Sequence, residues 1–201
     1  MRGLAVLGST RGTSMQPIID AIARRELDAS INAVISNKPD AYILERAKNH
    51  GINAIYIQPP TVDTRLPGEA ERRREEFDRE VMCILKEKQI DLVLLIGYMR
   101  ILSQLFVNAW RGKIMNVHPS LLPAFAGLMD LAVHEAVIAS GAKETGSTIH
   151  FVDEGADTGP IIIQKKCIVD PTDTPETLKA RVQKLEGEAC IEAIRLFASN
   201  A

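Results

Sequence analysis

The sequence predicts an α/β fold: one Rossmann-like domain with a mostly parallel, twisted sheet and helices on both faces. Short apolar, strand-like runs alternate with longer helix-like segments along the whole chain. Alternation of this kind is typical of parallel sheets joined by right-handed crossovers. The last two strand-like runs are joined by a long loop without a helix, which predicts a sheet that is mixed at one edge.

Each element has its own local signals. Gly8 closes the first strand, Thr13 or Ser14 can cap the first helix, and Gly51 ends the second helix. The Thr-Pro-Glu sequence at residues 174–176 supplies a cap, a proline in the first turn and an early acid for the last helix. Strands are therefore expected at residues 4–7, 31–36, 53–57, 91–96, 113–117, 148–152 and 161–169, and helices at 13–25, 40–50, 69–88, 131–140 and from 174 onward.

The composition is that of an ordinary globular protein and excludes several classes. A chain of 201 residues with 46% hydrophobic residues is long enough to bury one sizeable core. Its net charge of −2 gives no basic surface for nucleic acid, and no apolar run is long enough to cross a membrane. The three cysteines form no CxxC or Cys/His cluster, so no metal site is expected. Their small number and wide spacing fit a reducing compartment, so a cytoplasmic location is expected.

The segment at residues 116–127 carries the clearest chemical signal. Asn116 and His118 lie two apart at the end of a strand-like run, so both side chains point to the same face. Pro119 and Pro123 then stop regular structure and stiffen the following loop. A carboxamide beside an imidazole supplies an oxyanion donor and a titratable group. The residues alone leave open a second interpretation, in which both side chains only tie down a turn.

Three other loops are expected near this segment, because ligands of open parallel sheets bind beyond the carboxyl ends of the strands. Residues 9–14 run into a helix N-terminus, which suits a phosphate but is equally typical of a plain capped turn. Residues 99–102 contain a cation in an apolar stretch, as a ligand contact or a surface side chain would. Residues 153–160 place two acids around a glycine, which also fits a simple polar turn.

The string Asn-Val-His-Pro-Ser-Leu-Leu-Pro-Ala-Phe at residues 116–125 resembles the signature of the phosphoribosylglycinamide formyltransferase family. Similar blocks follow the same order over nearly the whole chain, at residues 36–41, 45–47, 97–103, 150–160 and 181–183. The resemblance implies one formyltransferase domain over 1–201, with a nucleotide-binding half at 1–108 and a catalytic and folate-loop half at 109–201. It implies transfer of a formyl group from 10-formyltetrahydrofolate to the primary amine of glycinamide ribonucleotide, without a metal.

The same resemblance implies roles for individual residues. The catalytic residues would be Asn116 as oxyanion donor, His118 as proton carrier or, in its protonated form, as a second stabiliser of the oxyanion, and Asp157 as the acid that orients the imidazole. The remaining assignments cover the two substrates: Gly12, Thr13, Ser14 and Glu186 for the nucleotide, and Arg74, Met99, Arg100, Ile101, Leu102, Asn116, Asp153, Glu154, Gly155 and Ala156 for the folate.

The other histidines receive no catalytic role from this reasoning. His50 and His134 are expected at the surface or at helix ends, and His150 is expected to be structural.

The chain also departs from the family pattern around the expected substrate amine. Arg11 is not the residue expected in the phosphate loop, Met129 replaces a histidine usual in bacterial members, and the 127–141 segment is longer. Alternative functions are therefore a formyltetrahydrofolate hydrolase, an amino-sugar formyltransferase, or a non-catalytic folate- or nucleotide-binding homologue. Chain length and charge favour the glycinamide substrate and disfavour a tRNA substrate. The expected partners are small molecules, and a chain of this size is compatible with a monomer or a homodimer.

Overall fold

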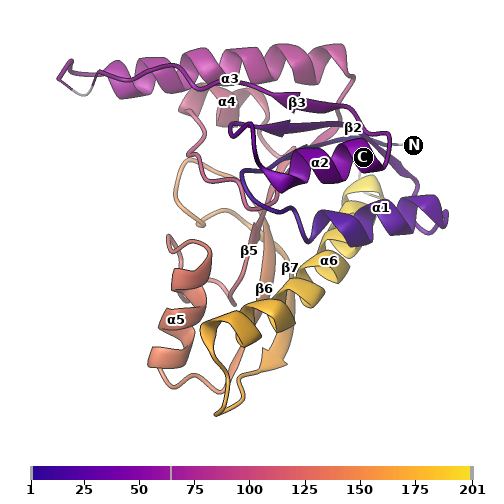
Figure 1. Cartoon of the computed structure of the whole chain (residues 1–201), viewed down its shortest axis with the longest axis vertical. Coiled ribbons are helices and arrows are strands. Elements are labelled where there is room, and N and C mark those ends of the chain that lie inside the picture. The colour runs from indigo at the N-terminus through magenta and orange to yellow at the C-terminus, as the bar shows by residue number, and fades with distance from the viewer. Residues whose placement is uncertain (1, 64, 200–201) are drawn as a thin grey trace. The chain divides into compact units, whose positions relative to one another are not determined.

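The computed structural model describes residues 2–63 and 65–199, which form two compact units (Figure 1). The first unit consists of Met1–Gly12 with Ala29–Ile114, and the second of Thr13–Asp28 with Met115–Ala201. Each unit has its own secondary structure and its own buried apolar residues. The two are therefore described one at a time.

The first unit is built on a parallel sheet with the strand order β3-β2-β1-β4. Its strands are β1 (Arg2–Leu7), β2 (Ala29–Ser36), β3 (Ala54–Tyr56) and β4 (Leu92–Leu95). They are short and largely apolar, and all pairs are parallel, as expected for strands that are covered on both faces. The helices of this unit are α2 (Tyr42–Asn49), α3 (Glu69–Glu87) and α4 (Gln104–Ala109).

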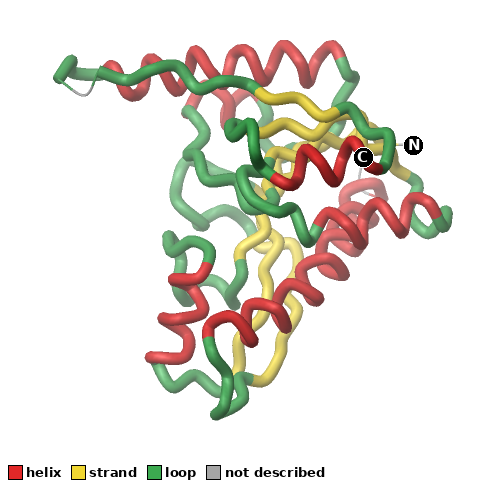
Figure 2. The backbone as a smooth tube through the Cα atoms, viewed as in Figure 1, coloured by secondary structure: helices red, strands yellow, loops and turns green. Residues whose placement is uncertain are grey.

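The second unit contains three antiparallel strands and three helices. β5 (Ile114–His118), whose first residue belongs to the first unit, pairs with β6 (Glu144–Phe151), and β6 pairs with β7 (Ile161–Ile168). The long helix α6 (Pro175–Ser199) contacts both β6 and β7, and it also contacts α1 (Met15–Ala23) and α5 (Leu131–Ala139). Figure 2 shows these strands in yellow beside the red helix α6.

The core of the second unit depends on apolar side chains at helical spacing. Val133 and Val137 of α5 pack against Leu178 and Val182 of α6, and all four are fully buried. These positions are four apart on each helix, so each pair lies on one face.

The predicted fold class is confirmed, because the sheet has seven strands, is mostly parallel and is antiparallel at one edge. All expected strands and helices are present, although β6 begins at Glu144 rather than at residue 148. Helix α4 was not predicted, because its six residues are too few to show helical periodicity. No described helix has the length and apolar character that a membrane span needs.

Candidate active site

Asp157 lies at the centre of a polar cluster in the second unit. One carboxylate oxygen, Oδ2, is 3.2 Å from Nδ1 of His118 and accepts the Gly127 N–H at 2.9 Å. The other oxygen, Oδ1, accepts a hydrogen bond from Nδ2 of Asn116 at 3.2 Å. The structure thus brings together the three side chains that the sequence predicts as catalytic, although Asp157 is separated from Asn116 by 41 positions in the chain.

The strand β5 and its neighbour β6 place these side chains. Asn116 and His118 lie two residues apart on β5, so their side chains are on the same face of the strand, and His118 is only 3% exposed. The loop that follows is held by Thr148 of β6, whose hydroxyl donates to the Ser120 carbonyl at 2.6 Å and accepts the Leu122 N–H at 3.1 Å. The proline-containing loop is therefore anchored to the same strand pair that carries the imidazole.

His150 belongs to this cluster, although sequence reasoning gave it no part in the site. It lies directly opposite Asn116 in the antiparallel β5–β6 pair, and its Nε2 is 3.1 Å from Asn116 Nδ2 and 3.5 Å from Asp157 Oδ1. Its Nδ1 donates to the Phe151 carbonyl at 2.9 Å. Nε2 therefore accepts from Asn116 when the ring is neutral and donates to Asp157 when the ring is protonated.

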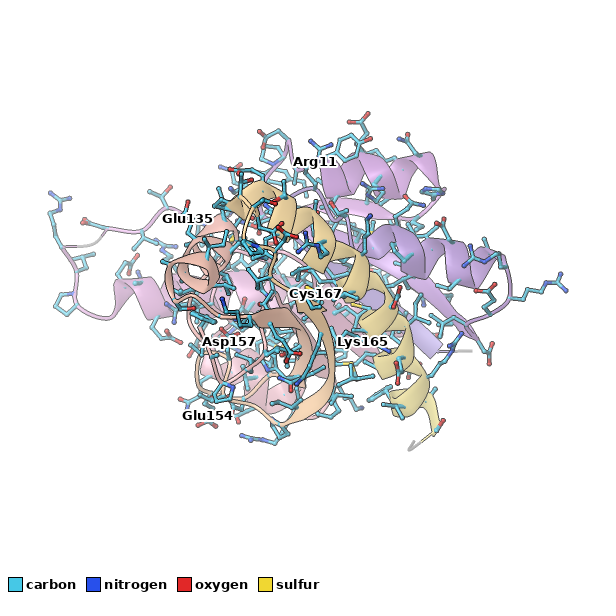
Figure 3. The ribbon with its side chains drawn as sticks, turned by 90° about the horizontal axis from the view of Figure 1, so that it is seen from below. Arg11, Glu135, Glu154, Asp157, Lys165 and Cys167 are labelled. Atoms are coloured by element: carbon cyan, nitrogen blue, oxygen red, sulfur yellow. The ribbon has the colours of Figure 1, made fainter. Side chains whose placement is uncertain are left out.

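The backbone at Asp157 is held in an unusual conformation. Its φ is +57°, in the left-handed region that non-glycine residues seldom adopt, with Asn and Asp the commonest exceptions. The loop before it, which connects β6 to β7, is tied together by Asp153, whose Oδ1 accepts the Gly155 N–H at 3.1 Å and the Thr158 hydroxyl at 2.7 Å. Asp157 and Glu154 of this loop are labelled in Figure 3. The loop conformation aims the Asp157 carboxylate at β5.

The surroundings of Asp157 keep its side chain ionised. Burial acts to raise the pKa of this carboxyl, but hydrogen bonds from His118, His150 and the Gly127 N–H, with the charge of His118, act more strongly and hold the pKa well below its usual range. The other ring nitrogen of His118, Nε2, is buried and makes no hydrogen bond within the described residues. The imidazole is therefore fixed through one nitrogen, and the other is left available to a reacting group.

Two of the predicted nucleotide-binding residues meet elsewhere in the second unit. Ser14 stands at the N-cap position of α1, as predicted, but its hydroxyl does not cap the helix. The hydroxyl instead donates to the carboxylate of Glu186 on α6, and Ser14 is 2% and Glu186 9% exposed. Burial raises the pKa of Glu186, and the Ser14 hydrogen bond opposes that effect. Thr13 precedes Ser14 in this unit, and Gly12, with a φ of +61°, ends the N-terminal segment of the first unit.

In the first unit, two of the predicted ligand-binding loops are joined by a hydrogen bond. The Met99 N–H donates to the Ser9 hydroxyl at 2.9 Å, and that hydroxyl donates to Oδ1 of Asn37 at 2.6 Å. Arg11 lies in the loop after Ser9, with its guanidinium carbon 5.3 Å from the ring centre of Tyr42.

The predicted folate-binding residues of the first unit lie on and beside α3. Arg74 forms an ion pair with Glu71 at 2.6 Å. The guanidinium carbon of Arg100 lies 4.2 Å from the ring centre of Phe77, and Ile101 is 65% exposed. The other predicted folate residues, Asp153 to Ala156, belong to the second unit, as do Asn116 and Asp157.

One expectation about the histidines is wrong. His134 was expected at the surface or at a helix end, but it lies within α5 and is 1% exposed. Its Nδ1 makes no hydrogen bond within the described part of the chain, and burial lowers its pKa to about 4. Position 134 lies three before the buried Val137, and this spacing was the signal in the sequence. His50 is exposed at the end of α2, as predicted.

Residues 2–63 and 65–199 include no group of three or more His, Cys, Asp or Glu side chains arranged to hold a metal ion.

Comparison with known proteins defines the class of this protein. The family model described as formyl transferase matches residues 2–194. The chain therefore belongs to the formyl transferase family, as the resemblance predicted, and the enzyme class expected from the sequence is confirmed.

The relatives narrow the class further. The phosphoribosylglycinamide formyltransferase of Bacillus subtilis (strain 168) is 37% identical over 186 residues, covering 92% of this chain and 89% of that protein. A crystal structure of glycinamide ribonucleotide transformylase 1 from Symbiobacterium toebii matches with a TM-score of 0.89 at 38% identity, covering 100% of this chain and 89% of that one. The trifunctional purine biosynthetic protein adenosine-3 of Drosophila melanogaster is 38% identical over 199 residues, and the chain spans 14% of its length.

Proposed function

We propose that this protein transfers the formyl group of 10-formyltetrahydrofolate to the primary amine of glycinamide ribonucleotide, as a step of de novo purine biosynthesis. The observation that carries the proposal is the arrangement of Asn116, His118 and Asp157, with both carboxylate oxygens of Asp157 engaged and Nε2 of His118 buried and unpaired among the described residues. The names of relatives that match this chain over most of their length support the same reaction.

In the proposed reaction the amine nitrogen of the nucleotide attacks the formyl carbon. A carbon–nitrogen bond forms, the carbonyl oxygen gains negative charge, and the amine nitrogen becomes positive. Asn116 Nδ2 is the donor for the developing oxyanion, and removing one such donor costs about 10²–10³ in rate. One N–H of Asn116 Nδ2 donates to Asp157 and fixes the orientation of the amide, and the other, which lies at His150 before the reaction starts, turns to the oxyanion.

His118 carries the proton in this scheme. Its Nδ1 is held by Asp157, so Nε2 can take a proton from the attacking nitrogen and give it to the folate nitrogen as the old carbon–nitrogen bond breaks. The low pKa of Asp157 keeps that side chain a carboxylate, and a carboxylate stabilises the protonated imidazole.

Gly12, Thr13, Ser14 and Glu186 are the proposed nucleotide contacts. Backbone N–H groups at the start of α1 suit the phosphate of the nucleotide. The buried carboxyl of Glu186 already accepts a hydroxyl hydrogen bond from Ser14. A ribose hydroxyl can replace that donor, and we assign Glu186 to the ribose for this reason.

The proposed folate contacts are Arg74 and residues 99–102 of the first unit, with Asn116 and Asp153–Ala156 of the second. The chemistry of the first group fits a polar, partly aromatic ligand, because Arg100 Nε is a buried atom without a hydrogen bond in the described part of the chain. A ligand with hydrogen-bonding edges supplies partners for such atoms. The functional halves, 1–108 and 109–201, remain a prediction.

The test is a turnover assay with purified chain, glycinamide ribonucleotide and 10-formyltetrahydrofolate, with the formylated nucleotide detected by mass. We expect product that requires both substrates and falls by about 10²-fold or more in His118→Ala. His50→Ala, at an exposed position at the end of α2, is the matched control and should retain full activity. Circular dichroism should show that both variants are folded.

Two results would contradict the proposal. Full activity in His118→Ala would show that the imidazole takes no part in the reaction. Release of formate at the same rate with and without the nucleotide would identify water as the acceptor, and the protein as a hydrolase of formyl-folate.

A further inference from the structure

The first unit contains a buried carboxylate that the proposed reaction does not use. Asp78 lies on α3 and is 1% exposed. Its Oδ2 accepts the N–H of Ser103 at 2.6 Å, and Ser103 itself is fully buried. Two cations act on its charge, Arg100 and Arg74, both proposed folate contacts. An aspartate is thus placed directly behind the loop that is proposed to bind the second substrate.

Burying the Asp78 carboxyl costs desolvation free energy unless its partners compensate for the lost water. Burial raises the pKa of Asp78, and its hydrogen bonds with Ser103 and the charges of Arg100 and Arg74 oppose that rise. An apolar residue would avoid the cost of desolvating the carboxyl, but it would leave the buried Ser103 N–H without a partner. The carboxylate is therefore matched to this N–H and to the two cations.

The loop that Asp78 holds has few other restraints. Residues 98–103 lie outside helices and strands, beyond the backbone hydrogen bonds that Ile96 and Gly97 make with Leu7 and Ser9. Two consecutive residues of α3 hold the far end of this loop: Phe77 lies under the guanidinium of Arg100, and Asp78 accepts the Ser103 N–H. The Ser9 hydroxyl holds the other end through the Met99 N–H. Between these anchors Ile101 is 65% exposed, so the middle of the loop is open to a ligand.

We propose that Asp78 is a positioning residue for the formyl-folate: it holds the 99–102 loop in its binding conformation through Ser103 and Arg100. This inference rests on the proposed function, because it takes residues 99–102 to be a folate contact. Asp78 touches neither substrate. Without the Asp78 carboxylate the loop adopts other conformations as well. The apparent Kd for the folate then equals the intrinsic Kd divided by the fraction of molecules whose loop is in the binding conformation, so affinity falls.

The chain offers a matched control for this contact. Asp91 is also an aspartate of the first unit whose Oδ2 accepts a backbone N–H, that of Gly3 at 3.0 Å. It lies before β4 and holds no residue of the 99–102 loop. Asp91→Ala therefore removes the same kind of hydrogen bond without disturbing the proposed folate contacts.

The experiment measures tetrahydrofolate binding by calorimetry, without the reaction, and the KM of each substrate in the turnover assay. Asp78→Ala should raise the Kd for tetrahydrofolate and the KM for 10-formyltetrahydrofolate by about tenfold, the usual effect of losing a charged hydrogen bond. The KM for the nucleotide should stay unchanged. Asp78→Asn keeps an oxygen that can accept the Ser103 N–H, so it should rescue most of the affinity and serves where Asp78→Ala does not fold. Asp91→Ala should leave both folate constants unchanged.

An unchanged Kd for tetrahydrofolate in a folded Asp78→Ala protein would overturn the inference, as would an equal rise in Asp91→Ala. If Asp78→Ala does not fold, a rise of about tenfold or more in the Kd of a folded Asp78→Asn protein would overturn it instead, because this variant keeps an acceptor for the Ser103 N–H. A wild-type protein that binds no tetrahydrofolate would contradict the proposed function itself, so the two failures are distinguishable.

Discussion

In each of the two units a carboxylate holds an irregular loop, and the pKa values of these two carboxylates, Asp78 and Asp157, are shifted in opposite directions. Asp78 in the first unit accepts the Ser103 N–H, and Asp157 in the second accepts the Gly127 N–H. The pKa of Asp78 is raised, with burial as the largest cause. The pKa of Asp157 is lowered, although burial acts on it in the same sense.

The difference lies in the partners. Asp157 has two imidazoles beside it, His118 and His150, and both favour its charged form. The two cations near Asp78 act through space and do not offset the loss of water. The neighbours thus set the ionisation of each carboxylate, in keeping with the proposed roles of Asp78 as an anchor and of Asp157 as part of a proton-carrying group.

The largest expected effect comes from removing the charge of the second carboxylate. Asp157→Asn should lower kcat by about 10²-fold or more, because the amide cannot stabilise a protonated His118. Asparagine tolerates the positive φ at this position, so the loop should keep its conformation. The parallel variant Asp78→Asn should keep kcat, and both constants come from steady-state assays. Equal losses of kcat in the two variants would contradict the proposal that Asp78 is an anchor and Asp157 a catalytic residue.

The opposite pKa shifts predict opposite effects of acid on stability. In an unfolded chain both carboxyls titrate near their common value of about 3.9. Native Asp157 binds its proton less readily than the unfolded chain, so its contribution to stability is present above that pH and is lost as pH falls. Native Asp78 binds its proton more readily, so its contribution is present at low pH and is lost as pH rises through the raised pKa.

Urea unfolding between pH 3 and pH 6 measures this contrast. The stability of wild type relative to Asp157→Asn should shrink as pH falls, whereas its stability relative to Asp78→Asn should grow. Two differences that change in the same direction would show that one of the two native pKa values is shifted the other way.

The sequence predicted the fold well because its elements are long or strongly patterned. Alternation of apolar strands and amphipathic helices needs no tertiary information, and the pair Asn116 and His118 follows from the two-residue period of a strand. Asp157 could be assigned only through the family resemblance, because a loop residue 41 positions from Asn116 gives no local signal of its partner.

The residues that sequence reasoning missed depend on packing and register. His150 joins the site because β6 pairs with β5 so that position 150 faces position 116, and strand register cannot be read from one sequence. Asp78 lies three before the buried Val81 on α3, so it shares the buried face, but its charge masked that spacing. The buried position of Asp78 is therefore readable in principle from helical spacing, whereas the place of His150 in the site is not.

The smallest expected effect separates two serines that stand at N-cap positions, one in each unit. Ser103 caps α4 by accepting the Phe106 N–H at 3.3 Å, so Ser103→Ala should lower the free energy of unfolding by about 1 kcal/mol and leave the nucleotide KM unchanged. The Ser14 hydroxyl donates to Glu186 and does not cap α1. Ser14→Ala should therefore change the nucleotide KM without removing a helix cap from α1. Denaturant unfolding and nucleotide titration of both variants test this pair. A nucleotide KM that changes in Ser103→Ala but not in Ser14→Ala would contradict the assignment of Glu186 to the ribose. If the Glu186 carboxyl binds the ribose, loss of its buried hydroxyl partner must alter nucleotide binding.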